Sequence, residues 1–194
     1  MGVSLAILAS GSGTNAENIA RFFKNHGNIE VRLILSNKAD AGVLDRAGRL
    51  GIPSRVFSRE QFQNPDFMLP MLRKAEADLL ILAGFLWLIP SFLVESYPDR
   101  IINIHPALLP AYGGKGMYGD HVHRAVIGAK EKKSGITIHY VNEKYDEGAI
   151  IEQFECAIEP DDSAETLAKK IHELEYKHFP EVIETVAKKI RNAH

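Results

Sequence analysis

The chain has 194 residues, 45% of them hydrophobic, and a formal net charge of −2 at pH 7, so it can bury one substantial core but lacks an overall basic surface for nucleic acid. No apolar run reaches the roughly 20 residues that span a bilayer, and the single Cys156 excludes an internal disulfide. We therefore expect one domain over 1–194 with small-molecule partners and no nucleic acid or membrane, as a monomer or homodimer. We also expect a cytoplasmic location, because the first strand-like segment follows the N-terminus without a signal-peptide pattern.

Short apolar runs alternate with amphipathic segments in the first half of the chain. The runs predict strands at 3–9, 30–36, 54–57, 78–83 and 100–104. The segments between them predict helices at 15–26, 39–50 and 66–77, and Pro70 should make the third helix begin late or kink. This alternation is typical of βαβ units, so the sequence predicts an α/β fold with a Rossmann-like, doubly wound, mostly parallel sheet.

The second half changes character after Pro110. The stretch 111–120 is rich in glycine and predicts a loop, and a short helix should follow over 121–129. Segments 135–142 and 148–158 predict a C-terminal antiparallel hairpin, turned sharply by Asp-Glu-Gly at 146–148. The last segment, 163–191, predicts a long C-terminal helix, with an imperfect capping box in which Thr166 replaces the usual acid and with a bend or break at Pro180.

A glycine loop, LASGSGTNA at 8–16, joins the first predicted strand to the first predicted helix. The backbone N–H groups and the helix dipole at such a junction favour a phosphate. The loop residues expected to bind it are Ser12, Gly13, Thr14 and Asn15. The loop also fits a relaxed dinucleotide fingerprint, but the acidic residue that would hold a ribose is replaced by Ser-Asn-Lys at 36–38. A simple capped strand–helix turn is the structural alternative.

Three polar residues form a candidate catalytic set. Asn103 and His105 end the fifth predicted strand on the same face, at the edge of the sheet where ligands bind. An amide and an imidazole so placed can stabilise an oxyanion, and Asp146 in the later turn could accept a proton nearby. The sequence therefore favours acyl transfer, although each residue could also serve only to cap a strand or satisfy a turn.

Two longer motifs that contain these three residues resemble those of a known protein family. The segment N-I-H-P-A-L-L-P at 103–110 and the segment G-I-T-I-H-Y-V…Y-D-E-G-A-I at 135–150 resemble the two signatures of the formyltransferase family. The loop G-S-G-T-N at 11–15, A-G-F at 83–85 and E-x-x-x-F-P at 175–180 resemble the branch that acts on glycinamide ribonucleotide. The likeness covers about residues 4–185 and includes both signatures in the family's order.

The resemblance implies an activity and a catalytic machinery. The formyl group of 10-formyltetrahydrofolate, the co-substrate, would pass to the amine of glycinamide ribonucleotide in purine synthesis, without a metal. Asn103, His105 and Asp146 would be catalytic, with His139 and His121 in support, and Asp146 would keep His105 protonated. About residues 1–100 would bind the phosphate, and about residues 101–194 would carry catalysis and bind folate.

The resemblance also implies two binding sets. The acceptor would be bound by Ser12, Gly13, Thr14, Asn15, His172 and Glu175. The folate would be bound by Leu86, Trp87, Leu88, Val141, Tyr145 and Asp146. Trp87 stands where many relatives carry arginine, so it is a candidate either for altered folate contact or for an interface.

Four other functions compete with this interpretation. A formyltetrahydrofolate hydrolase would use the same core with water as acceptor, and a methionyl-tRNA formyltransferase would need a further tRNA-binding domain. A non-catalytic nucleotide-binding module would use the glycine loop alone. A metal-dependent hydrolase would gather imidazoles and a carboxylate, although two histidines spaced H-x-H on a helix point apart. The residues concerned are His105, His121, His123, His139 and Asp146.

Overall fold

The computed structural model describes residues 2–192. Its strands are β1 (Val3–Leu8), β2 (Ile29–Ser36), β3 (Ser54–Val56), β4 (Leu79–Leu82), β5 (Ile101–His105), β6 (Lys133–Tyr140) and β7 (Ile150–Ala157). Its helices are α1 (Thr14–Phe23), α2 (Gly42–Leu50), α3 (Arg59–Phe62), α4 (Pro65–Lys74), α5 (Ser91–Ser96), α6 (Asp120–Gly128) and α7 (Ala164–Asn192). Within this part of the chain, no helix combines the length and the apolar character that a membrane crossing requires.

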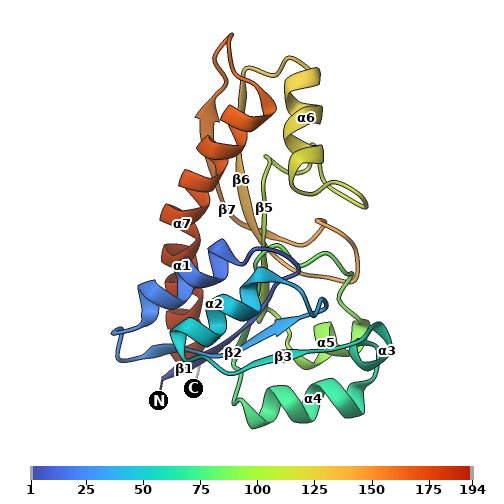
Figure 1. Ribbon diagram of the computed structural model, residues 1–194, viewed down its shortest axis with the longest axis vertical. Coiled ribbons are helices and arrows are strands. Elements are labelled where there is room, and N and C mark those ends of the chain that lie inside the picture. Colours follow the sequence, from blue (N-terminus) through green and yellow to red (C-terminus); the bar gives the residue numbers. More distant parts are fainter. Residues whose placement is uncertain (1, 193–194) are drawn as a thin grey trace.

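The strands form one sheet in the order β3-β2-β1-β4-β5-β6-β7. The first five pair in parallel, whereas β6 runs antiparallel to both β5 and β7. The chain therefore winds outward from β1 in both directions, and the loops after β1 and β4 diverge at the centre of the sheet. The predicted Rossmann-like sheet, with its antiparallel C-terminal hairpin and long final helix, is confirmed (Figure 1).

Helices cover the two faces of the sheet in separate layers. Leu5 and Ile7 of β1 pack into a core shared with α1, α2, α6 and α7. Ala6 and Leu8, which point the other way, pack into a second core with α3, α4 and α5. Strand β1 is buried along its whole length, which explains why it is apolar at every position except Ser4 instead of alternating between apolar and polar residues.

Neither Pro70 nor Pro180 interrupts its helix, so the predicted late start of the third helix and the predicted break at Pro180 are wrong. Helix α4 begins with Pro65 at its first position, capped by Asn64, and continues past Pro70. Helix α7 is also unbroken at Pro180. Proline cannot donate to the carbonyl four residues earlier, and here Asn18 Nδ2 donates to that carbonyl, of Tyr176, at 2.8 Å. A neighbouring helix thus replaces the missing hydrogen bond.

The N-terminus of α7 is better capped than the sequence suggested. The Thr166 N–H donates to Ser163 Oγ at 3.3 Å, and the Ser163 N–H donates to Thr166 Oγ1 at 2.8 Å. A threonine therefore completes the reciprocal pattern of a capping box.

The connection between β6 and β7 also differs from its prediction. Strand β6 ends at Tyr140 and β7 begins at Ile150, so residues 141–149 form a loop instead of a sharp turn at 146–148. Gly148 allows close contact with β6, because a Cβ there would lie 1.8 Å from the Tyr140 oxygen. Asp146 has a φ of 57°, in the left-handed region. The loop thereby brings Asp146 to the end of β5.

Candidate active site

A cavity of about 600 Å³ lies at the carboxyl ends of β1, β4 and β5. It is at the point where the chain directions diverge, which is where ligands bind in open α/β sheets. Its wall includes the glycine loop after β1, the segment 83–86 after β4 and the end of β5. Residues of α6, α7 and the two loops 114–119 and 145–146 complete it.

The glycine loop is fixed from behind by α2. Gly13 has a φ of 76°, and a Cβ on it would lie 2.5 Å from the Cβ of Val43. The carbonyls of Gly11 and Ser12 accept hydrogen bonds from Val43 N at 3.1 Å and Arg46 Nε at 2.7 Å. The loop residues that line the cavity are Ser10, Gly11, Ser12, Gly13, Thr14 and Asn15. This places the N-terminus of α1 at the cavity wall, where an anion is favoured.

The three predicted catalytic residues meet in this cavity. Asn103 and His105 alternate along β5, and Asp146 reaches them from the loop 141–149. Asp146 Oδ1 lies 3.5 Å from Asn103 Nδ2, and Asp146 Oδ2 lies 3.5 Å from His105 Nδ1. Both contacts are long for hydrogen bonds, so an amide and an imidazole face one carboxylate without being tightly bound to it.

His139 supports this set from β6, where it pairs directly with Asn103. The Tyr140 carbonyl lies 2.7 Å from His139 Nδ1 and can only accept a hydrogen bond, so Nδ1 carries a proton. In the neutral ring, Nε2 then accepts from Asn103 Nδ2 at 3.0 Å. His139 therefore fixes the direction of the Asn103 amide.

The protonation predicted for His105 needs correction. Burial lowers the pKa of His105, and this outweighs the raising effects of Asp146 and of the hydrogen bond to Tyr112. The ring is only 3% exposed, and its Nε2 donates to the Tyr112 carbonyl at 2.8 Å. The resting ring is therefore neutral near pH 7, although its Nε2–H remains a donor.

Asp146 is an ionised carboxylate in this environment. Burial raises its pKa, but His139, His105 and the Gly114 N–H together hold the pKa of Asp146 below its usual value. The Gly114 N–H donates to Oδ2 at 2.9 Å. The cavity therefore holds a negative charge beside the Asn103 amide and the His105 imidazole.

Glu175 forms a second polar cluster across the cavity. It is buried on α7, and its Oε2 accepts from Asn15 Nδ2 at 2.9 Å and contacts His172 Nδ1 at 3.0 Å. The hydrogen bond to Glu175 raises the pKa of His172. Because Asn15 belongs to the glycine loop, this cluster joins α7 to the anion-binding end of α1.

The cavity wall contains most of the predicted site residues. Those that line it are Ser12, Gly13, Thr14, Asn15, Leu86, Asn103, His105, Tyr145, Asp146, His172 and Glu175. Leu88 is instead exposed, Val141 packs against the second core, and His121 is exposed with its ring against Tyr118. Trp87 packs on Phe57, Phe62 and Phe85, with the Arg59 guanidinium 5.3 Å from its ring centroid.

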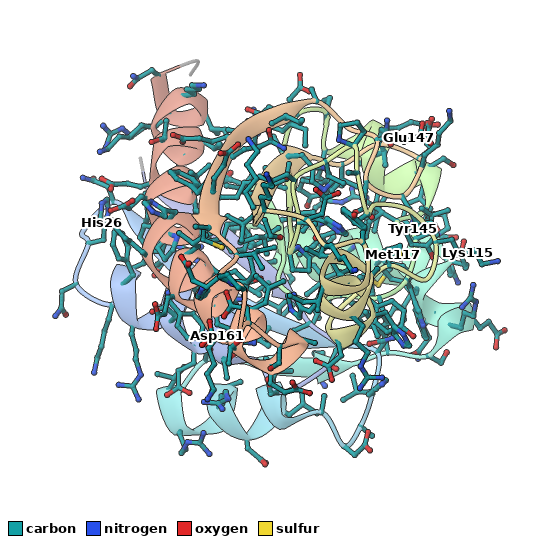
Figure 2. All side chains as sticks on the ribbon, turned by 90° about the horizontal axis from the view of Figure 1, so that it is seen from above. His26, Lys115, Met117, Tyr145, Glu147 and Asp161 are labelled. Atoms are coloured by element: carbon teal, nitrogen blue, oxygen red, sulfur yellow. The ribbon has the colours of Figure 1, made fainter. Side chains whose placement is uncertain are left out.

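Sequence reasoning missed other lining residues. Lys38 lines the cavity, and so does His123, the buried member of the H-x-H pair. The loop 114–119 adds Lys115 and Met117, which Figure 2 shows on the same side of the molecule as Tyr145. An α-helix has 3.6 residues per turn. A clear spacing of apolar residues along α6 could therefore have placed His123 on the buried face of that helix. Nothing local in the sequence identifies the loop residues.

The five residues considered as metal ligands do not form a metal site. Across residues 2–192, no three His, Cys, Asp or Glu side chains are arranged to hold a metal ion. His121 and His123 lie on different faces of α6, one exposed and one buried.

Comparisons with known proteins agree with this geometry. The family model described as formyl transferase matches residues 3–183. The phosphoribosylglycinamide formyltransferase of Bacillus subtilis is 38% identical over 92% of this chain and 91% of that relative. The chloroplastic enzyme of the same name from Arabidopsis thaliana is 43% identical over 92% of this chain. The chain spans only 63% of that relative and 60% of the one from Vigna unguiculata.

Solved structures give the same result for the fold. The phosphoribosylglycinamide formyltransferase from Anaplasma phagocytophilum superposes with a TM-score of 0.87 and 32% identity, covering 97% of this chain and 89% of that one. The enzyme from Bacillus halodurans has a TM-score of 0.84 and 34% identity, covering 98% and 97%. With a family match over nearly its whole length and an amide, an imidazole and a carboxylate at the end of β5, the chain belongs to the formyl transferase family.

Proposed function

We propose that this protein transfers the formyl group of 10-formyltetrahydrofolate to the amine of glycinamide ribonucleotide, a step of purine synthesis in the cytoplasm. The observation that carries this proposal is the meeting of Asn103, His105 and Asp146 in one cavity with the glycine loop at its wall. The names of the relatives supply the acceptor, and membership of the formyl transferase family supports a folate as the formyl donor.

The reaction adds an amine to a formyl carbon, so negative charge develops on the formyl oxygen. Asn103 Nδ2 and His105 Nε2–H are the donors suited to that oxygen. His105 Nε2 now donates to the Tyr112 carbonyl, so the formyl oxygen takes the place of that carbonyl when the donor binds. The growing charge then favours the imidazolium form of His105, which takes up its second proton at Nδ1 from solvent and returns it when the oxyanion collapses to the carbonyl.

Asp146 acts on the charge and on the proton. Its carboxylate faces the Nδ1 side of His105 at 3.5 Å, so it stabilises the imidazolium as the oxyanion forms. The adduct must also lose a proton from the amine nitrogen while N10 of the folate gains one. Asp146 is the base suited to relay this proton, because its lowered pKa keeps it ionised.

The acceptor and the folate occupy different walls of the cavity. Ser12, Gly13, Thr14 and Asn15 bind the phosphate at the end of α1, and Glu175 with His172 binds the ribose or glycinamide part. Leu86 and Tyr145 contact the folate, while Trp87, Leu88 and Val141 shape the surface beside it. A phosphate subsite next to a buried carboxylate favours a phosphorylated amine over the bare water of a hydrolase.

An acceptor panel tests the proposal. The protein is supplied with 10-formyltetrahydrofolate and with glycinamide ribonucleotide, water alone or methionyl-tRNA, each with and without a chelator. We expect tetrahydrofolate release that depends on glycinamide ribonucleotide and is unchanged by the chelator. Release at the same rate without any amine would identify a hydrolase and overturn the proposal.

A further inference from the structure

The histidine and carboxylate side chains that line the cavity differ in one respect. His105, Asp146, His172 and Glu175 each have a hydrogen-bond partner in the protein. His123, on α6, is 3% exposed, and its Nδ1 is buried without a partner. A buried polar atom without a partner costs free energy of folding, so each such atom in a native protein calls for an explanation, such as a catalytic role or a bound water or ion.

A second unpartnered atom lies in the same wall. Asn15 uses its Nδ2 to bind Glu175, and its Oδ1 is buried without a partner. An amide oxygen can only accept a hydrogen bond, and a neutral imidazole offers one accepting nitrogen. Together with the Glu175 carboxylate, these groups form an acceptor-rich wall that suits a ligand with several N–H groups.

His123 is neutral near pH 7. Burial is the largest influence and lowers the pKa of His123. The charged and titratable groups that act on it are His172 and Glu175 from α7, Asp120 from α6 and His105 from β5. Glu175 and Asp120 raise the pKa, but their effects are smaller than that of burial. The neutral ring therefore has one unprotonated nitrogen that is available to a proton or an N–H group of a ligand.

We propose that His123 is the base that deprotonates the acceptor's amino group before it attacks the formyl carbon, with Asn15 Oδ1 orienting that group. This rests on the proposed function, and it separates two proton steps. A primary α-amine has a pKa of about 7.7–8.0, so the acceptor arrives largely as an ammonium ion without a nucleophilic lone pair.

Two protons leave the acceptor nitrogen in separate steps. The ammonium ion gives one proton to the His123 ring, which becomes an imidazolium, and the freed lone pair forms the bond to the formyl carbon as the C=O pair moves onto oxygen. The adduct nitrogen loses its second proton to N10 through Asp146, and the C–N10 bond breaks. His123 then releases its proton to solvent. His105 and Asn103 remain free to hold the oxyanion throughout.

The test compares His123→Gln with wild type and with Arg124→Gln, an exposed neighbour on α6. Turnover per acceptor concentration, kcat/KM, is measured from pH 6 to pH 9. Without the base only the neutral amine reacts, which for a pKa near 8 is roughly one molecule in 30 at pH 6.5. We expect kcat/KM of His123→Gln to fall by up to about 30-fold at pH 6.5 and to approach that of wild type at pH 9, while kcat/KM of Arg124→Gln follows wild type throughout.

Dividing kcat/KM of the variant by kcat/KM of wild type at each pH cancels the effects of groups that titrate in both proteins. These groups include His105, His172, Glu175 and Asp120. A ratio that stays constant with pH would show that His123 only shapes the cavity and would overturn the proposal. If His123→Gln unfolds at a lower temperature, His123→Ala with added imidazole gives a second readout. Rescue that strengthens with the pKa of the added imidazole supports the base, and no rescue in folded protein contradicts it.

Failure of the proposed function is distinguishable from failure of this inference. If the wild-type protein forms no formylated glycinamide ribonucleotide at any pH, the proposed function is wrong. If the wild type is active and His123→Gln matches it from pH 6 to pH 9, only the role of His123 is wrong.

Discussion

Replacing Asp146 by asparagine removes one charge from the cavity while keeping the shape of the side chain. The residue has a φ of 57°, and asparagine tolerates this left-handed conformation at least as well as aspartate. The amide can still use its oxygen to accept from the Gly114 N–H, which now donates to Oδ2 at 2.9 Å. We therefore expect Asp146→Asn to fold normally and to bind folate, but to lose most of its turnover.

The size of the loss follows from the distance to His105. A unit charge 3.5 Å from the imidazolium contributes about 5 kcal/mol at an effective dielectric constant of about 20, which is an upper bound. At about 1.4 kcal/mol per tenfold change in rate, this bound corresponds to more than three decades. Since solvent and the neighbouring dipoles replace part of the interaction, we expect kcat to fall by about 100- to 1000-fold.

The assay is kcat at saturating concentrations of both substrates, with Glu147→Gln as the matched control. Glu147 is the next residue along the chain, and its exposed carboxylate pairs with Lys144 at 3.0 Å. Its loss should leave kcat within about twofold, as for most exposed positions away from a site. Turnover of Asp146→Asn within about fivefold of wild type would refute the role given to the carboxylate.

A double-mutant cycle examines whether Asp146 and His105 act as one unit. Either single change removes the same stabilised imidazolium, so His105→Asn combined with Asp146→Asn should cost little more in kcat than the worse single change. Fully additive losses would mean that the two residues contribute independently.

Three further outcomes are expected. Asn103→Ala removes one oxyanion donor and should lower kcat by about 100-fold while leaving folate binding intact, as measured by steady-state kinetics and calorimetry; an unchanged kcat would exclude that donor. Gly13→Ala should lower the free energy of unfolding by more than the roughly 1–2 kcal/mol that a left-handed alanine costs, because the new Cβ would also collide with Val43 of α2. The control is Gly11→Ala, whose Cβ would meet nothing within 4 Å. Its free energy of unfolding, measured by denaturant titration, should stay within about 0.5 kcal/mol of wild type. The hydrogen bond to Glu175 raises the pKa of His172, so the pair stabilises the fold below about pH 6.5. This stability is lost as the pH rises through the folded-state pKa. The Tm of wild type should therefore exceed that of His172→Gln by less as the pH rises, and a constant difference would contradict the pairing.

The sheet could be predicted from the sequence because its central strands are buried on both faces. For that reason strand β1 is apolar at every position except Ser4, and each predicted strand overlaps the observed one. Helices α3 and α5 were missed because each has six residues or fewer. Such lengths are too short for a helical period to stand out.

The catalytic residues were predictable from their motifs, but their surroundings were not. Burial of His105, which lowers its pKa, comes from contacts between distant parts of the chain. The unbroken course of α7 at Pro180 likewise depends on Asn18, which is far from it in sequence. The H-x-H motif showed that its two histidines point apart, yet only the packing of α6 decides that His123 faces the cavity.

The fate of the formyl carbon tests most directly whether the protein transfers the formyl group to glycinamide ribonucleotide. The protein is given 10-formyltetrahydrofolate labelled with carbon-13 in the formyl group, together with glycinamide ribonucleotide, and the label is followed by NMR. We expect the label to appear as an amide formyl on the glycinamide nitrogen, in an amount equal to the tetrahydrofolate released. Label that appears as free formate, with glycinamide ribonucleotide left unchanged, would contradict it.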